Sequence, residues 1–378
     1  MNEAVIAISA VCLAAWVYLL ALHGEFWRSR PVLETGQPTG RARVAVVVPA
    51  RDEAENIRAS IGSLLQQQYP GELAVILVDD NSSDGTAEIA ARLDGSSRLT
   101  ILQGEPLPAG WSGKLWAVHQ GLAHEQARAA RYILLTDADI VHAPGHVAAL
   151  VAKAERDHLD LVSEMVRLNC TTGAERALIP AFVFFFQMLY PFARVADPNK
   201  RTAAAAGGTI LVTRAALDRI EGVSRIRHQL IDDCALARAV KRAGGRLWLG
   251  HAEDAVSRRV YGGWREVWDM IALTAYVQLG RSPLLLLGCI VAMSVLYLWP
   301  PLLAAMGRGL PRMLGASAWL LMAIALQPTL RRYRRSPLWG LALPAIALFY
   351  LGATIASASR HYAGRGGGWK NRVYPQNQ

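Results

Sequence analysis

Two acidic clusters decide the fold of this chain: Val-Asp-Asp-Asn-Ser-Ser-Asp-Gly-Thr at 78–86 and Leu-Thr-Asp-Ala-Asp-Ile at 135–140. Each cluster directly follows an apolar run that is typical of a buried strand. Ligands of parallel α/β sheets bind beyond the carboxyl ends of the strands, where both clusters should lie. The Asp-x-Asp spacing sends the side chains of Asp137 and Asp139 to one side of an extended backbone. That pair can hold a divalent cation, Mg²⁺ or Mn²⁺, and through it a diphosphate.

Strand-like and helix-like segments alternate through the middle of the chain. Apolar and β-branched runs predict strands, and apolar residues at helical spacing predict the helices between them. The predicted strands are 42–49, 73–78, 99–103 and 132–136, and the predicted helices are 56–68, 86–93 and 114–130. A parallel sheet requires this alternation, so we expect a mostly parallel, Rossmann-like α/β domain over residues 42–282.

The composition indicates a membrane protein. Hydrophobic residues make up 52% of the chain and the mean hydropathy is +0.20, with the apolar residues concentrated at the two ends. The run 4–22 is long enough to cross a bilayer as a helix and predicts an anchor over residues 1–27. A cleavable signal peptide is the alternative, but the run lacks a basic segment before it and a clear small-x-small cleavage site after it.

Three more apolar stretches, 283–306, 313–330 and 338–359, predict transmembrane helices over residues 283–359, followed by a basic tail at 360–378. Four arginines within 331–335 predict a cytoplasmic loop, which places the polar middle of the chain in the cytoplasm, at a bacterial inner membrane. If each apolar stretch crosses the membrane once, counting from that loop places the C-terminal tail outside, although the basic residues of the tail favour the cytoplasm. One stretch, such as that with Pro300 and Pro301, could dip into the membrane without crossing it.

The formal net charge of +10 fits this topology and attraction to anionic lipid headgroups. The chain carries no nucleic-acid recognition motif, so a nucleic-acid partner is not expected. Its four cysteines are scattered and predict neither a disulfide framework nor a zinc site.

Four motifs in this order resemble the signature of family 2 glycosyltransferases: Val-Val-Pro-Ala-Arg-Asp-Glu at 47–53, the two acidic clusters, and Ile-Asp-Asp-Cys-Ala-Leu-Ala at 231–237. Gly-Trp-Ser-Gly-Lys at 110–114, Gly-Gly-Thr at 207–209 and the apolar ends are most similar to the hopene-associated, ceramide-glucosyltransferase-like branch. The resemblance implies a GT-A nucleotide-sugar-binding fold, a metal-dependent inverting hexosyl transfer, and a role in hopanoid biosynthesis.

The resemblance also implies roles for residues at the donor. Arg51 and Glu53 stand where the family binds the nucleotide base and ribose, although a charged turn after a strand is commonplace. Either Asp79 or, by preference, Asp80 accepts a hydrogen bond from uracil or ribose. Asp137 and Asp139 hold the cation. The competing interpretation of that pair is a solvated turn, but two unpaired carboxylates at a buried strand end would be costly.

Asp232 and Asp233 begin a helix-like stretch, where carboxylates also suit the helix dipole. The resemblance makes Asp233 the general base that deprotonates the acceptor hydroxyl. An inverting displacement needs one such base and no covalent nucleophile.

Lys114 and the glycines Gly207 and Gly208 are further candidates at the nucleotide sugar. Lys114 opens a helix after a glycine-containing loop and could reach a phosphate, or it could simply be exposed. The two glycines would let the backbone approach the sugar closely, or form an ordinary loop. Many family members carry Gln/Arg-x-x-Arg-Trp after the base, whereas here Arg258 and Arg259 are the nearest candidates to meet the leaving diphosphate. This departure argues against processive synthesis.

The aromatic stretch 177–195 predicts a helix lying in the membrane surface, with a core helix as the alternative. We therefore expect transfer of one sugar from a nucleotide sugar, with a bias to UDP, to a membrane lipid. A second hypothesis for an enzyme is a glycosyltransferase whose acceptor is a polyprenyl phosphate, which needs no strong base. The hypothesis for a protein that is not an enzyme is a membrane scaffold or a lipid transporter.

Overall fold

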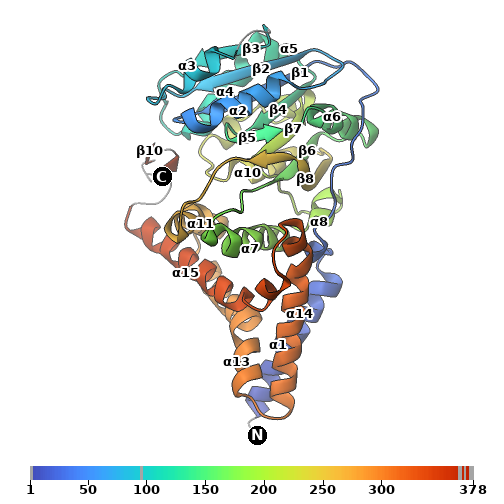
Figure 1. Cartoon of the computed structure of the whole chain (residues 1–378), viewed down its shortest axis with the longest axis vertical. Helices are drawn as coiled ribbons and strands as arrows, with labels where there is room; N and C mark the ends of the chain where they lie inside the picture. The colour runs from blue at the N-terminus through green and yellow to red at the C-terminus, as the bar shows by residue number, and fades with distance from the viewer. Residues whose placement is uncertain (1–2, 94–96, 365–367, 370–371, 374–378) are drawn as a thin grey trace.

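The computed structural model describes residues 3–93, 97–364, 368–369 and 372–373. Figure 1 shows an α/β domain at one end and long helices at the other, with α7 (Gly173–Leu189) and α11 (Trp264–Gln278) crossing between them. Arg365 and Lys370 of the predicted basic tail lie outside the described residues.

Eight strands form the sheet of the domain, in the order β3-β2-β1-β4-β7-β6-β8-β5. Their bounds are β1 Val44–Ala50, β2 Leu73–Asp79, β3 Leu99–Gln103, β4 Tyr132–Thr136, β5 Ile140–His142, β6 Leu161–Arg167, β7 Thr209–Thr213 and β8 Leu247–Ser257. Strands β3, β2, β1 and β4 run parallel, whereas β7 is antiparallel to β4 and β6, and β5 is antiparallel to β8. The parallel half therefore presents the carboxyl ends of β1, β2 and β4 at one edge.

Helices cover both faces of the sheet. They are α2 Ala54–Leu65, α3 Thr86–Ala91, α4 Gly113–Ala123, α5 Glu125–Ala129, α6 His146–Arg156, α9 Arg214–Arg219 and α10 Asp232–Arg242. The buried residues of α2 and α6 pack in one core with one face of β1 and β2, and those of α4, α5 and α10 pack in a second core with the other face. Covered on both faces, β1 and β2 are buried throughout, which explains their near-continuous apolar sequences.

The predicted strands 99–103 and 132–136 are found with these bounds, and those at 42–49 and 73–78 are found at 44–50 and 73–79. The predicted helix 114–130 is two helices, because His124 adopts an extended conformation with ψ 145°. The strands β5 to β8, which form the mixed half of the sheet, were not predicted from the sequence. Buried polar residues such as Ser163, Glu164 and His251 interrupt the apolar runs of its strands.

Five segments of the described residues are long and apolar enough to cross a membrane: Glu3–Leu22, Gly173–Ala196, Pro283–Met306, Leu310–Arg332 and Leu343–Tyr362. The first is α1 and the second joins α7 to α8 (Phe192–Ala196). The third comprises α12 (Pro283–Met293), a π-helical turn (Ser294–Leu298) and α13 (Trp299–Met306), so the helix continues through Pro300 and Pro301. The last two are α14 and α15.

The chain reverses direction after α14, so the last predicted apolar stretch, 338–359, first runs back along α14 before α15 begins. After α14 ends, the short helix η4 (Pro337–Gly340) folds against it: Gln327 donates to the carbonyl of Pro337 and Trp319 donates to that of Leu341. From there α15 climbs obliquely to α11, where the hydroxyls of Tyr362 and Tyr276 are 2.9 Å apart. The end of α15 therefore lies on the same side of the helices as the α/β domain (Figure 1).

The helix predicted within 177–195 is packed between the two parts of the molecule. Ile179 and Val183 of α7 belong to the core of the domain, whereas Leu178, Phe184 and Phe185 pack with the long helices. Figure 1 shows α7 running across the axis of those helices. The helix is therefore largely buried, as a core helix would be, and its position at a membrane surface stays a prediction.

We predict that Gly121→Ala destabilises the domain by about 1–3 kcal/mol, because overpacking a tight contact forces backbone shifts. A Cβ at Gly121 in α4 would lie 2.5 Å from Cγ1 of Val47 in β1. The matched control is Gly62→Ala in α2, where a Cβ meets nothing within 4 Å. Thermal unfolding of the detergent-solubilised protein measures both. Equal melting temperatures for the two variants would contradict this packing.

Candidate active site

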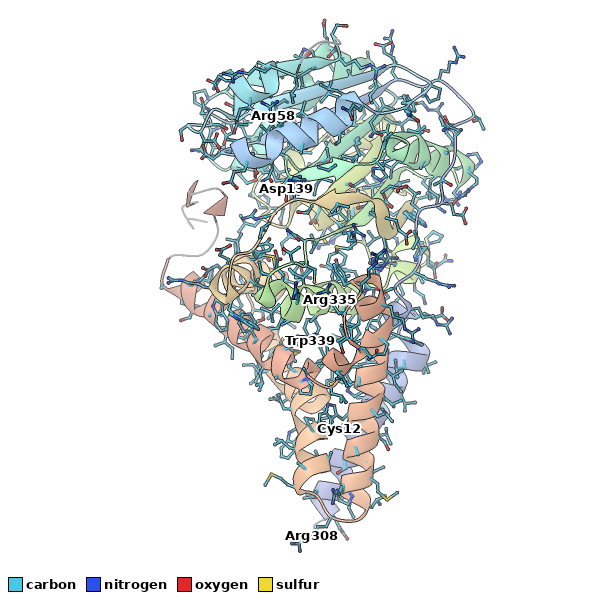
Figure 2. All side chains as sticks on the ribbon, in the orientation of Figure 1. Cys12, Arg58, Asp139, Arg308, Arg335 and Trp339 are labelled. Atoms are coloured by element: carbon cyan, nitrogen blue, oxygen red, sulfur yellow. The ribbon has the colours of Figure 1, made fainter. Side chains whose placement is uncertain are left out.

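A cavity of about 770 Å³ lies beyond the carboxyl ends of β1 and β4, between the domain and the layer of α7 and α11. Figure 2 shows Asp139 at this level, far from Arg308 at the opposite tip of the helices. The predicted site residues that line the cavity are Arg51, Glu53, Lys114, Asp137, Asp139, Gly207, Gly208, Asp232, Asp233 and Arg259. Three others, Asp79, Asp80 and Arg258, are absent from its lining.

Asp137 and Asp139 follow β4 directly, as the sequence predicted. Asp139 is tied to the end of β8: its Oδ2 accepts a hydrogen bond from Oγ of Ser257 at 2.8 Å, and its carbonyl accepts one from the amide of Arg258. Burial and, after it, the Asp137 carboxylate raise the pKa of Asp139 to about 6. The shift reports negative charge that neighbouring residues compensate only in part.

Lys114 joins the two acidic motifs. It occupies the first turn of α4, whose N-cap Ser112 accepts a hydrogen bond from the amide of Leu115. Its Nζ lies 2.8 Å from Oδ1 of Asp137 and 3.4 Å from Oδ2 of Asp232. Burial alone would lower the pKa of Lys114, but these carboxylates raise it above its ordinary value, so the ammonium stays charged.

Asp232 and Asp233 form the first turn of α10, where the helix dipole favours negative charge. Oδ1 of Asp233 accepts a hydrogen bond from the amide of Cys234 at 2.6 Å. Burial and then the neighbouring Asp232 carboxylate raise the pKa of Asp233 to about 7. A carboxylate with this pKa takes and releases a proton near neutral pH, as a general base must.

Gly207 and Gly208 are glycines for two different reasons. A Cβ at Gly207 would project among the charged groups, 3.5 Å from both Oδ2 of Asp233 and Nζ of Lys114. A Cβ at Gly208 would collide with Val166 at 2.9 Å. Gly207 therefore keeps the space between the acidic motifs open, and Gly208 allows the backbone to pack closely beneath it.

Arg51 connects the ends of β1 and β2. Its Nη1 donates to the carbonyl of Asp80 at 2.6 Å and lies 3.4 Å from Oδ2 of Asp80, which is almost fully buried. Asp79 is also buried, and its Oδ1 is without a hydrogen-bond partner among the described residues. A buried acceptor without a partner is costly, so this oxygen could take a hydrogen bond from a ligand N–H group that reaches it.

Arg258 and Arg259 are both exposed, but only Arg259 lines the cavity. The amide of Arg259 donates to Oγ of Ser257 at 3.2 Å, and its guanidinium carbon stands 5.4 Å from the ring centroid of Tyr261. Of the two predicted arginines, Arg259 is thus the one placed toward the acidic centre.

The opposite part of the cavity wall is apolar. Phe182 and Phe186 of α7 and Leu273 of α11 line it, with Met165 and Leu168 from β6 and the loop after it. The aromatic stretch 177–195 pointed to α7, but single residues on α11 carried no local signal. One cavity therefore joins a charged end to an apolar end.

Sequence reasoning also missed Ser257 and Tyr261. Ser257 is the last residue of β8 and the hydrogen-bond donor to Asp139, and Tyr261 supports Arg259. Both stand in the segment where the chain departs from the family motif, so the resemblance offered nothing to carry over. The pairing of β8 with β5, which begins at Ile140, brings Ser257 to the acidic pair.

The donor set around Asp137 and Asp139 fits a hard divalent cation. Among the described residues, no group of three or more His, Cys, Asp or Glu side chains that could hold a metal is found. Two carboxylates plus oxygen atoms of a phosphate and water are the usual ligands of Mg²⁺ bound with a nucleotide. The raised pKa of Asp139 is the property that a nearby cation would reverse.

Residues 45–221 match the sequence model of the family described as Glycosyl transferase family 2. The match contains both acidic clusters and ends before Asp232 and Asp233. A curated relative, 4,4'-diaponeurosporenoate glycosyltransferase of Staphylococcus aureus strain USA300, is 32% identical over 97 residues. Those residues are 26% of this chain and 24% of the relative, so the chain spans about a quarter of that protein.

A solved structure of similar fold is a mannosyltransferase from Pyrobaculum calidifontis in complex with GDP-Man and Mn²⁺. The two chains superpose with a TM-score of 0.58 over 97% of this chain and 100% of the other, at 20% sequence identity. The expected GT-A-like fold, with apolar helices near the N-terminus and in the C-terminal region, is thereby confirmed. Residues 45–221 are thus similar to family 2 glycosyltransferases, and the chain has a GT-A-like α/β fold.

Proposed function

We propose that this chain is a membrane-bound, inverting glycosyltransferase that moves a single sugar from a nucleotide sugar to a lipid. The observation that carries the proposal is the cavity with two unlike ends: carboxylates, Lys114 and Arg259 at one, and side chains of α7 and α11 at the other. A charged donor and an apolar acceptor can meet only where such ends share one space.

The donor occupies the charged end. Arg51 and Glu53 line the side nearest β1, and the buried Oδ1 of Asp79 supplies an acceptor for a base N–H. In this respect Asp79 is better suited than Asp80, whose carboxylate already faces Arg51. The donor nucleotide is UDP in our proposal, and the GDP-Man in the related structure makes GDP the alternative to test.

A divalent cation would be held by Asp137 and Asp139, and it would supply Lewis-acid stabilisation of the departing diphosphate. The residues themselves perform the remaining tasks. Arg259 neutralises charge on the leaving diphosphate. Lys114, whose ammonium lies 2.8 Å from Oδ1 of Asp137, would donate to a phosphate oxygen of the donor.

Asp233 accepts the proton of the acceptor hydroxyl. Its raised pKa keeps the carboxylate basic enough to take that proton near neutral pH. Asp232 has a different role from Asp233. Like Asp137, it forms an ion pair with Lys114, and it orients the lysine side chain. Four carboxylates around this position disfavour an acceptor that is itself an anion, so a hydroxyl fits better than a phosphate.

The acceptor is a membrane lipid that approaches across α7 and α11. Apolar side chains of these helices form the cavity wall, and one of them, Leu273 of α11, is exposed. The hopanoid context rests on the resemblance alone.

We place the domain on the cytoplasmic side of a bacterial inner membrane. The four arginines at 331–335 lie at the domain end of α14, where Figure 2 shows Arg335 beside α7. Helix α15 ends on the domain side of the long helices, so we place the basic residues that follow it in the cytoplasm, as the positive-inside rule requires. Counting each apolar stretch as one crossing had placed them outside.

The test is transfer of radiolabelled sugar from a panel of UDP- and GDP-sugars into organic-extractable lipid by membranes that carry the protein. We predict label in lipid with wild type and none with Asp139→Ala, because that variant loses a cation ligand. The control is Asp157→Ala, which removes a surface carboxylate paired with Lys153. Failure of wild type to transfer from every donor, with no Mn²⁺-dependent nucleotide binding, favours the scaffold or transporter.

Asp233→Asn should lower the transfer rate by about 10²–10⁴-fold, the usual contribution of a general base. The carboxyl is protonated and inactive below its pKa, so the wild-type rate should rise through about pH 7 as the proton leaves. Initial rates between about pH 5 and pH 9 check this. Undiminished transfer by Asp233→Asn would indicate an acceptor that needs no base, such as a polyprenyl phosphate.

Phe186→Ala should lower kcat/KM for the lipid acceptor by about 10–100-fold, because an apolar contact of the acceptor is lost. Nucleotide affinity should stay at the wild-type value. The control is Leu189→Ala on the same helix, which changes an exposed side chain that is absent from the cavity lining. An equal loss in both variants would move the acceptor away from this cavity.

A further inference from the structure

Glu175 is a fully buried carboxylate just below the cavity, and none of the roles above uses it. It stands in the first turn of α7. Its Oε2 accepts hydrogen bonds from the amides of Thr171 and Thr172 at 2.8 and 2.9 Å, which together with Thr172 completes a capping box. A helix cap alone explains one carboxylate oxygen.

The second oxygen reaches another part of the chain. Oε1 of Glu175 accepts a hydrogen bond of 2.7 Å from the amide of Tyr261. The hydroxyl of Thr172 donates to the carbonyl of the same Tyr261 at 2.9 Å. Both backbone groups of Tyr261 are therefore held by the N-terminus of α7, across a large separation in sequence.

Tyr261 ends a short segment that is fixed at its other end as well. Ser257 donates to Asp139, and the amide of Arg258 donates to the carbonyl of Asp139. Between these two attachments stands Arg259, whose guanidinium lies over the ring of Tyr261. Within the described part of the chain, Arg259 forms no salt bridge with a carboxylate, so its direction depends on how the segment 257–261 is anchored.

We infer that Glu175, with Thr172, is a positioning residue: it anchors Tyr261 so that Arg259 points at the diphosphate of the donor. This inference rests on the proposed function, because it assigns Arg259 to the donor. It also gives α7 a second role, since the helix that contributes Phe182 and Phe186 to the acceptor end would set the arginine at the donor end.

The chemistry of the clamp suggests the variant. In Glu175→Gln, one oxygen can still accept from Thr171 and Thr172, but the amide nitrogen then faces the amide of Tyr261 and cannot accept from it. The capping box is kept and the tie to Tyr261 is cut. The matched control is Glu155→Gln, since Glu155 also accepts from a backbone amide, that of Thr39, away from the cavity.

The measurement is calorimetric binding of UDP and GDP, with Mn²⁺, to the full chain in detergent. UMP and GMP, which lack the second phosphate, serve as reference ligands. We expect Glu175→Gln to weaken diphosphate binding about tenfold, the effect of misplacing one charge-assisted contact, and to leave monophosphate binding unchanged. Glu155→Gln should bind all four nucleotides as wild type does.

A double-mutant cycle separates positioning from general support of the fold. If Glu175 acts through Arg259, the double variant Glu175→Gln/Arg259→Ala binds diphosphates no more weakly than Arg259→Ala. Losses that multiply, or that affect mono- and diphosphates alike, would overturn the inference, as would wild-type affinity in Glu175→Gln.

A second pair of variants applies if Glu175→Gln fails to fold. Thr172→Val removes the hydroxyl that donates to Tyr261, and Thr172→Ser retains it, so only the valine variant should lose diphosphate affinity. Equal affinities in the two variants contradict the clamp. Normal nucleotide binding without sugar transfer by wild type would refute the proposed transferase and leave the clamp standing, whereas no nucleotide binding would refute both.

Discussion

The site depends on a local excess of negative charge. Asp137, Asp232 and Asp233 surround the ammonium of Lys114 at the edge of a buried sheet, and Asp139 lies beside Asp137, so like charges repel strongly there. Two of these carboxyls respond with raised pKa values. The folded backbone holds these carboxylates together. Strand β4 ends just before Asp137, helix α10 begins at Asp232, and Gly207 leaves the space between the two motifs open.

That excess of charge explains why the cavity suits a metal nucleotide. A diphosphate brings more negative charge, so a cation between Asp137 and Asp139 and a guanidinium such as that of Arg259 are needed to balance it. The same field would repel an anionic acceptor from Asp233, and together with burial it raises the pKa of this carboxyl toward neutral pH. Donor binding, leaving-group stabilisation and deprotonation would thus follow from one electrostatic condition.

The long helices extend this arrangement. Ser29, Thr329, Gln187 and His251 form a buried chain of hydrogen bonds that links the segment after α1, then α14, α7 and β8. Buried polar groups are costly unless paired, so this chain fixes the long helices to the domain in one orientation. The hydrogen bonds thereby fix the position of α7, which lines the apolar end of the cavity, relative to the domain that carries the charged end.

The sequence predicted the elements whose signals are local. The apolar strands β1 to β4, the long apolar helices and the carboxylates that follow β4 could all be identified from neighbouring residues. The strands β5 to β8 of the mixed half could not, because polar residues interrupt this half of the sheet and the partners of these strands are distant in sequence. For the same reason Ser257, Tyr261 and Glu175 were missed: each acts through a contact between segments that only the folded chain brings together. Lys114 was predicted to meet a phosphate and is found between Asp137 and Asp232, a pairing that depends on the placement of α10.

The most direct test of the central claim is an experimental structure of the full chain with UDP or GDP and Mn²⁺. The account predicts the metal between Asp137 and Asp139, the diphosphate beside Arg259, and Lys114 turned from Asp137 to a phosphate oxygen. A nucleotide bound elsewhere, or a metal that does not contact these two carboxylates, would contradict it.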